Sequence, residues 1–126
     1  MKKIYYRKLV RDKIPEVIKK SGGDFETYKL AKKEFEKELL KKVGEESDGL
    51  LTAKTKEELI SEMADIVEVI EEIKRFKKIT SQQVENARKA NFRRKGGFKK
   101  RLFLVCASDT GYRSNERRYG RRSRKK

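Results

Sequence analysis

The sequence predicts an all-α fold, an antiparallel helix bundle followed by a basic tail. Apolar residues recur at helical spacing between about residues 33 and 94. Two segments begin with a Thr-x-x-Glu/Gln pattern that caps helices. Only two short segments, near residues 25–30 and 100–105, have the pattern of extended chain. Since 126 residues suffice for one modest core, we expect one domain over residues 1–105 and a flexible tail over residues 106–126.

The first expected helix is short and follows Asp12. Pro15 suits only the first turn of a helix, and the apolar Val17 and Ile18 follow it after Glu16. The helix should end near Lys20, because Ser-Gly-Gly-Asp follows. Residues 25–30 then alternate as in a short strand or an extended connector.

Two longer helices are expected next. The first covers about residues 33–51, although Gly44 and Gly49 each weaken it by roughly 1 kcal/mol relative to alanine. The second begins at the capping box of Thr55 and Glu58 and has the most apolar sequence in the chain. Its apolar stripe consists of Leu59, Met63, Ile66, Ile70 and Ile73, widened by Ile60, Val67 and Val69. A stripe this wide predicts a central helix that is buried on more than one side.

The last expected helix begins at Thr80 and runs to about Arg94, where Gly96 and Gly97 stop it. Residues 100–105 are predicted to be extended. After Cys106 the sequence becomes polar and contains glycine, so we expect no stable structure there.

Composition restricts the kinds of site that the chain can hold. Cys106 is the only cysteine and there is no histidine, which excludes an internal disulfide and disfavours a Cys/His zinc site. A metal must therefore be held by oxygen. The longest apolar stretch, residues 102–107, is too short to cross a bilayer, and no apolar signal region follows Met1. A cytoplasmic location is expected.

The net charge of +16 is concentrated in the C-terminal third. Residues 1–84 hold 20 Lys and Arg against 17 Asp and Glu, whereas residues 85–126 hold 16 against 3. Such a basic segment indicates attraction to nucleic acid or another polyanion. It does not by itself name a function.

Acidic residues cluster on the two longest predicted helices: Glu45, Glu46 and Asp48 on the first, Glu62 and Asp65 on the second. Glu62 and Asp65 share one helical face because they are three residues apart. Carboxylates from an antiparallel neighbour would complete an oxygen site suited to Mg²⁺ and to the phosphates that Mg²⁺ binds. The alternative is that all five are solvated acids on Lys/Glu-rich helices. Asp65 favours the metal site, because a carboxylate is costly to bury in so apolar a segment without a metal or a hydrogen-bond donor.

Four blocks of sequence, in this order, carry a resemblance to a known family. They are Lys-Leu-Val-Arg-Asp-Lys-Ile-Pro-Glu at 8–16, the pair Glu45-Glu46, Glu62-x-x-Asp65, and Arg-Lys-Gly-Gly-Phe-x-Lys-Arg-x-Phe-Leu at 94–104. Together they resemble the MazG-like, phosphoribosyl-ATP pyrophosphohydrolase-like group of all-α nucleoside-triphosphate pyrophosphatases. The resemblance spans residues 4 to about 105. It implies a helical homodimer that hydrolyses nucleoside triphosphates to monophosphate and pyrophosphate, often to clear damaged or non-standard nucleotides.

The resemblance also implies roles for the acids. Glu45 and Glu46 would hold Mg²⁺ or its waters, with Glu62 and Asp65 as the second acidic pair and Mn²⁺ as an alternative ion. Glu45 or Glu46 would be the catalytic carboxylate that orients or deprotonates the attacking water. The candidate residues for binding the triphosphate are Arg11, Lys13, Lys89 and Arg94, with ordinary surface charge as the alternative for each.

The sequence departs from the family at Gly49, where the family has a third glutamate. Asp48 stands one residue earlier and is therefore rotated by roughly 100° on a helix. The departure admits three interpretations: weaker metal binding, replacement by Asp48 through a local distortion near the glycines, or decayed activity. On the first interpretation, Gly49→Glu is expected to tighten Mg²⁺ binding.

Two other functions compete with hydrolysis. The chain is alternatively a nucleic-acid-binding or ribonucleoprotein-associated protein that uses its basic C-terminal third on a catalytically weakened helical scaffold. Tyr112 and Tyr119 stand among arginines there, an arrangement that suits stacking on single-stranded bases. The third reading is a domain that serves only dimerisation.

Overall fold

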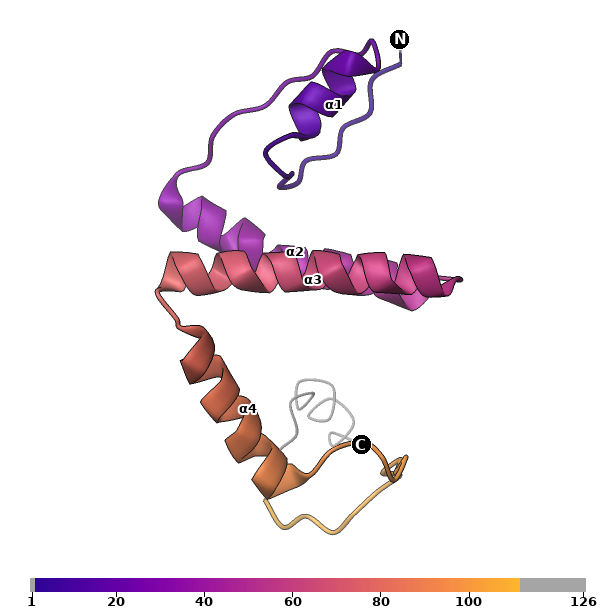
Figure 1. Ribbon diagram of the computed structural model, residues 1–126, viewed down its shortest axis with the longest axis vertical. Coiled ribbons are helices and arrows are strands. Elements are labelled where there is room, and N and C mark those ends of the chain that lie inside the picture. The colour runs from indigo at the N-terminus through magenta and orange to yellow at the C-terminus, as the bar shows by residue number, and fades with distance from the viewer. Residues whose placement is uncertain (1, 112–126) are drawn as a thin grey trace. The chain divides into compact units, whose positions relative to one another are not determined.

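The computed structural model describes residues 2–111, whose regular secondary structure consists of α-helices (Figure 1). In chain order these are α1 (Ile14–Lys20), α2 (Lys32–Thr52), α3 (Lys56–Lys77) and α4 (Ser81–Lys95). The all-α prediction is confirmed for this part of the chain, where neither 25–30 nor 100–105 forms a strand. No helix within it is long and apolar enough to cross a membrane.

The chain separates into two units, Met1–Ala90 and Asn91–Lys126, so the division falls inside α4. The predicted boundary between a domain and a tail, after residue 105, stays a prediction. Of the predicted tail, residues 112–126 lie outside the described part of the chain, and so do Tyr112 and Tyr119.

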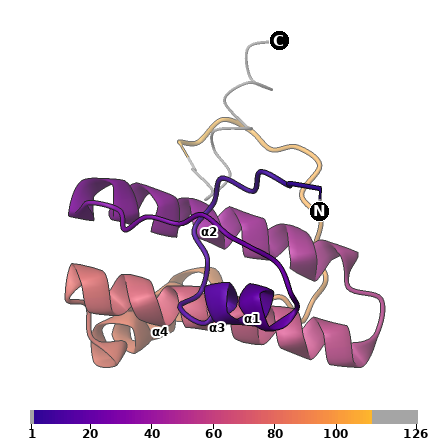
Figure 2. The same ribbon diagram turned by 90° about the horizontal axis from the view of Figure 1, so that it is seen from above.

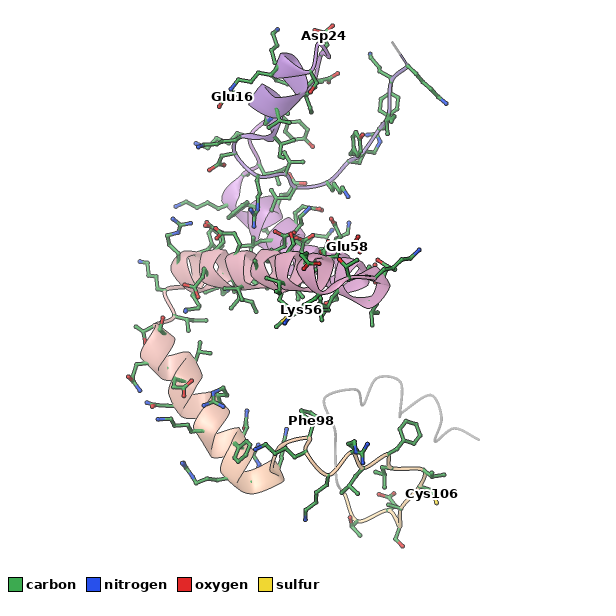
Figure 3. The ribbon with its side chains drawn as sticks, turned by 45° about the vertical axis from the view of Figure 1, so that its right-hand side comes forward. Glu16, Asp24, Lys56, Glu58, Phe98 and Cys106 are labelled. Atoms are coloured by element: carbon green, nitrogen blue, oxygen red, sulfur yellow. The ribbon has the colours of Figure 1, made fainter. Side chains whose placement is uncertain are left out.

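The starts of α3 and α4 follow from the capping patterns in the sequence. Thr55 Oγ1 accepts a hydrogen bond from the Glu58 backbone N–H at 3.1 Å, and Glu58 itself lies in the first turn of α3 (Figure 3). The Glu58 carboxylate accepts from the Lys54 N–H at 2.8 Å rather than from the N–H of Thr55. At α4 the box is reciprocal, because Thr80 and Gln83 each accept from the other's backbone N–H, at 3.0 and 2.8 Å.

Pro15 and Gly96 also lie at helix ends, as the sequence predicted. Pro15 lies in the first turn of α1. Gly96 follows α4 with φ +79°, a left-handed conformation that glycine adopts without strain. Lys78 takes the same role after α3 with φ 58°, and the Ile79 N–H closes the turn on the Lys74 carbonyl at 2.8 Å.

In α4, Arg88 donates hydrogen bonds to Glu85 at 2.8 and 2.9 Å, and these bonds lower the pKa of the exposed Glu85 carboxyl.

Helices α2 and α3 lie side by side and antiparallel, joined by a short loop (Figures 1 and 2). Among the described residues the buried apolar side chains are Leu39 of α2 and Val69 of α3. Phe35 and Phe76 add an edge-to-face contact with ring centroids 5.2 Å apart. These contacts fix α2 and α3 against each other, and the two helices provide the frame for the acidic residues.

The prediction that α3 is buried on more than one side is wrong for the single chain. Ile60, Met63 and Val67 are 57%, 54% and 56% exposed, and the one buried side chain of α3 is Val69. The physical reason is that α2 alone covers only one side of α3. Part of the wide apolar stripe of α3 therefore does not pack on α2 and stays exposed.

Candidate metal centre

Three of the predicted acidic residues converge between α2 and α3. Glu46 comes from α2, and Glu62 and Asp65 come from α3. One carboxylate oxygen from each lies within 4.8 Å of those of the other two, and all three residues are half-buried. We call this group the carboxylate triad. It forms because residues 62 and 65 share a face of α3, and because antiparallel pairing brings residue 46 of α2 opposite that face.

The N-terminal segment reaches the triad through Arg11. Its guanidinium Nη2 donates a hydrogen bond to Asp65 Oδ1 at 3.2 Å. Two residues earlier, the Leu9 carbonyl accepts from Lys42 Nζ of α2 at 2.9 Å. Residues 9–11 are therefore attached to both helices, and a predicted phosphate-binding residue stands beside the acids that are predicted to hold the metal.

Glu45, the other catalytic candidate, lies outside the triad. Its Oε1 is 3.2 Å from Lys42 Nζ and 4.0 Å from Lys8 Nζ. Neighbouring residues on a helix point about 100° apart, so Glu45 and Glu46 cannot both face the same point on α3. Glu46 is thus the member of the pair that is placed to hold a metal, whereas Glu45 pairs with lysines.

Lys8, Lys42 and the Leu9 carbonyl were not among the candidate site residues predicted from the sequence. The spacing of Lys42 and Glu45, three residues apart on a helix, was a usable signal for that ion pair. Nothing in the sequence pattern indicated the Leu9 carbonyl as an acceptor for Lys42, because that contact depends on how the N-terminal segment lies along α2.

Of the remaining predicted site residues, Asp48, Lys13 and Lys89 lie in the first unit and are not among the contacts of the triad. Asp48 is exposed on α2 and is not part of the group. Lys13 is exposed immediately before α1, and Lys89 is exposed on α4. Arg94 belongs to the second unit, where it donates to Asn91 Oδ1 at 3.0 Å. Their predicted roles in binding metal or phosphate stay predictions.

The helix α2 continues through both of its glycines. It is one helix from Lys32 to Thr52, so the local distortion that would have turned Asp48 into the site is absent. Gly49 faces the Glu62 side chain, and a Cβ built at Gly49 would lie 2.4 Å from Glu62 Oε2. The space where a side chain at position 49 would lie is thus occupied by the Glu62 carboxylate of α3.

The triad has the chemistry of a divalent-cation site. All three donors are carboxylate oxygens, which hard cations such as Mg²⁺ and Mn²⁺ prefer. The three carboxylates carry three negative charges, and the guanidinium of Arg11 offsets one of them. A divalent ion would neutralise the two negative charges that remain. Oxygens up to 4.8 Å apart can meet one ion through small side-chain rotations, since metal–oxygen distances are about 2.0–2.1 Å for Mg²⁺. The residues therefore fit the implied ion.

No family model, curated protein or solved structure matches the chain. The likeness to MazG-like pyrophosphatases accordingly rests on the four sequence blocks.

Proposed function

We propose that the protein is a Mg²⁺-dependent nucleoside-triphosphate pyrophosphohydrolase of the MazG-like kind. It cleaves the triphosphate between the α and β phosphates and releases monophosphate and pyrophosphate, and damaged or non-standard nucleotides are among its substrates. The observation that carries the proposal is the convergence of Glu46, Glu62 and Asp65 with Arg11 beside them. The order of the four sequence blocks supports the same reaction.

In this proposal Glu46, Glu62 and Asp65 would hold Mg²⁺, which would supply positive charge to offset the phosphates and the departing pyrophosphate. Arg11 releases Asp65 and pairs with a phosphate oxygen, for which its planar guanidinium is well suited. A triad carboxylate, Glu46, orients the attacking water and accepts its proton. Glu45 acts indirectly, because its pairs with Lys8 and Lys42 keep the Arg11 segment next to the triad.

The proposal is tested by incubating the purified full chain with a panel of standard and modified nucleoside triphosphates. With Mg²⁺ present we expect equal amounts of monophosphate and pyrophosphate, and with excess chelator we expect neither. Release of orthophosphate in place of pyrophosphate would mean a different phosphoryl-transfer reaction. No product from any nucleotide, with Mg²⁺ or Mn²⁺, would contradict the proposal.

We also propose that the active form is a homodimer formed through α3. Four apolar residues, spaced three, four and three apart on one face, are exposed by 39–57%: Ile60, Met63, Val67 and Ile70. A chain whose described core contains only Leu39 and Val69 needs further apolar burial for stability. A second copy offers the same face, and two such faces are self-complementary about a two-fold axis.

Val67→Glu, in the middle of this face, is expected to convert a dimer into a monomer, because the interface would then contain two buried unpaired carboxylates. Sedimentation velocity at micromolar concentration measures the change. Leu51→Glu is the matched control, since Leu51 is 82% exposed on α2 and is not part of this face. A wild-type chain that sediments as a monomer would rule out this interface.

The charge distribution favours a second function beside hydrolysis. The 16 Lys and Arg in residues 85–126, against 3 acids, favour contact with phosphates, so we propose that this part of the chain binds RNA or DNA mainly through its tail, residues 106–126. This binding is independent of the triad, and the two functions are compatible in one protein.

A further inference from the structure

Gly49 approaches Glu62 more closely than any side chain at that position would allow. A Cβ built at Gly49 would lie 2.4 Å from Oε2, 2.7 Å from Cδ and 3.1 Å from Oε1 of Glu62. Real Cβ atoms essentially never come within 3.0 Å of another heavy atom, so any larger residue moves the carboxylate, and this shift costs little because the carboxylate ends a flexible side chain. Glu62 is a member of the triad, and its carboxylate lies in the space that the glycine leaves open.

The backbone of α2 gives no other reason for glycine at this place. Gly49 lies inside a regular helix, and it is not among the described glycines with positive φ. Glycine lowers helix stability relative to alanine, which is a cost without local benefit. The second glycine of the same helix, Gly44, differs in its surroundings, because a Cβ there would meet nothing within 4 Å. Of the two, only Gly49 is in contact with the candidate site.

We propose that Gly49 is a positioning residue for the metal centre. Its missing side chain lets the Glu62 carboxylate lie against α2, where one of its oxygens is within 4.8 Å of oxygens of Glu46 and Asp65. The space beside position 49 of α2 is thereby filled by Glu62, which the resemblance already counts as a metal ligand of the second acidic pair. This inference rests on the metal site of the proposed function.

The inference reverses the expectation drawn from the sequence. A glutamate at position 49 was expected to supply a missing ligand, but in the structure the Glu62 carboxylate already occupies that space. A new side chain would displace Glu62, so the ligand that it adds would come at the expense of one already in place. We therefore expect Gly49→Glu to bring no tighter metal binding.

The test is direct binding of Mn²⁺ to the full chain, measured without nucleotide by the electron paramagnetic resonance signal of the free ion. We expect Gly49→Ala to weaken Mn²⁺ binding by more than twofold, because the methyl group moves the Glu62 carboxylate from its place beside Glu46 and Asp65. Gly44→Ala is the matched control, and its affinity should stay within twofold of the wild type. Circular dichroism should show that both variants keep their helices, since alanine favours the helix at both positions.

A double-mutant cycle shows whether Gly49 acts through Glu62. In a Glu62→Gln background, the added Gly49→Ala change should weaken Mn²⁺ binding less than twofold, because the ligand that it displaces is already gone. Equal affinity of wild type and Gly49→Ala, or tighter binding by Gly49→Glu, would overturn the inference and leave the metal site intact. A wild-type chain that binds no Mn²⁺ would overturn the metal site, and the inference with it.

Discussion

Glu62→Gln and Asp65→Asn are each expected to reduce pyrophosphate release by more than about 100-fold at saturating Mg²⁺, since loss even of groups that only support metal ligands costs about 10–100-fold. Neither change should alter the helical content, because both side chains are only half-buried and take no part in the Leu39 and Val69 core. Initial rates of pyrophosphate formation measure the first effect, and far-UV circular dichroism measures the second.

Glu68→Gln is the matched control for these two variants. Glu68 is an exposed acid on the same helix and is not part of the triad, so its replacement should leave the rate unchanged. Without metal, Glu62→Gln should slightly raise the thermal stability by relieving repulsion among carboxylates. Asp65→Asn should not, since it also weakens the pair with Arg11, an exposed contact worth at most about 1 kcal/mol. Turnover that survives in both site variants would disprove the assignment of the triad.

Truncation after Val105 is expected to abolish most binding to RNA or DNA and to leave nucleotide hydrolysis unchanged. The resemblance to pyrophosphatases ends near residue 105, whereas residues 113–126 alone contain 8 Lys and Arg against one acid, Glu116. If these cations contact phosphates, log affinity of the full chain should fall with log salt by roughly 0.7 to 0.9 per phosphate contact. Titration of a fluorescent oligonucleotide at several salt concentrations measures this slope.

In the truncated chain the slope should nearly vanish, while the rate of pyrophosphate release serves as the control for an intact catalytic domain. Binding of equal strength after truncation would show that the cations responsible lie before residue 106. Loss of folding would show that residues 106–126 belong to the domain, and that the predicted boundary is misplaced.

Local sequence signals predicted the helices well. The capping patterns at Thr55 and Thr80 gave the starts of α3 and α4, and Gly96 gave the end of α4 to within a residue or two. These features depend on hydrogen bonds within one turn, so the neighbouring residues determine them. The burial of α3 was not predicted correctly, because periodicity measures how wide the apolar face is and not what covers it.

The candidate site was predicted in part for the same reason. Glu62 and Asp65 share a face of α3 because they are three residues apart. A short loop returns α3 along α2, and this pairing brings both acids near one acid of the Glu45-Glu46 pair. Whether Glu45 or Glu46 points towards α3 depends on the rotation of α2 about its axis. The sequence pattern does not determine that rotation. The approach of Gly49 to Glu62 depends on that rotation and on the spacing between the helices, and no spacing rule in the sequence expresses either.

The pairing of α2 with α3 also has a consequence for the order in which the protein forms. The two helices are joined by only Ala53, Lys54 and Thr55, so their contacts close a small loop of chain. Helical proteins dominated by such local contacts fold fast, within about microseconds to milliseconds. The hairpin should therefore be an early folding unit, and closing it brings Glu46 towards Glu62 and Asp65 before any distant segment arrives. Cations in solution are therefore expected to speed the collapse of the hairpin, because they screen the carboxylates as they come together.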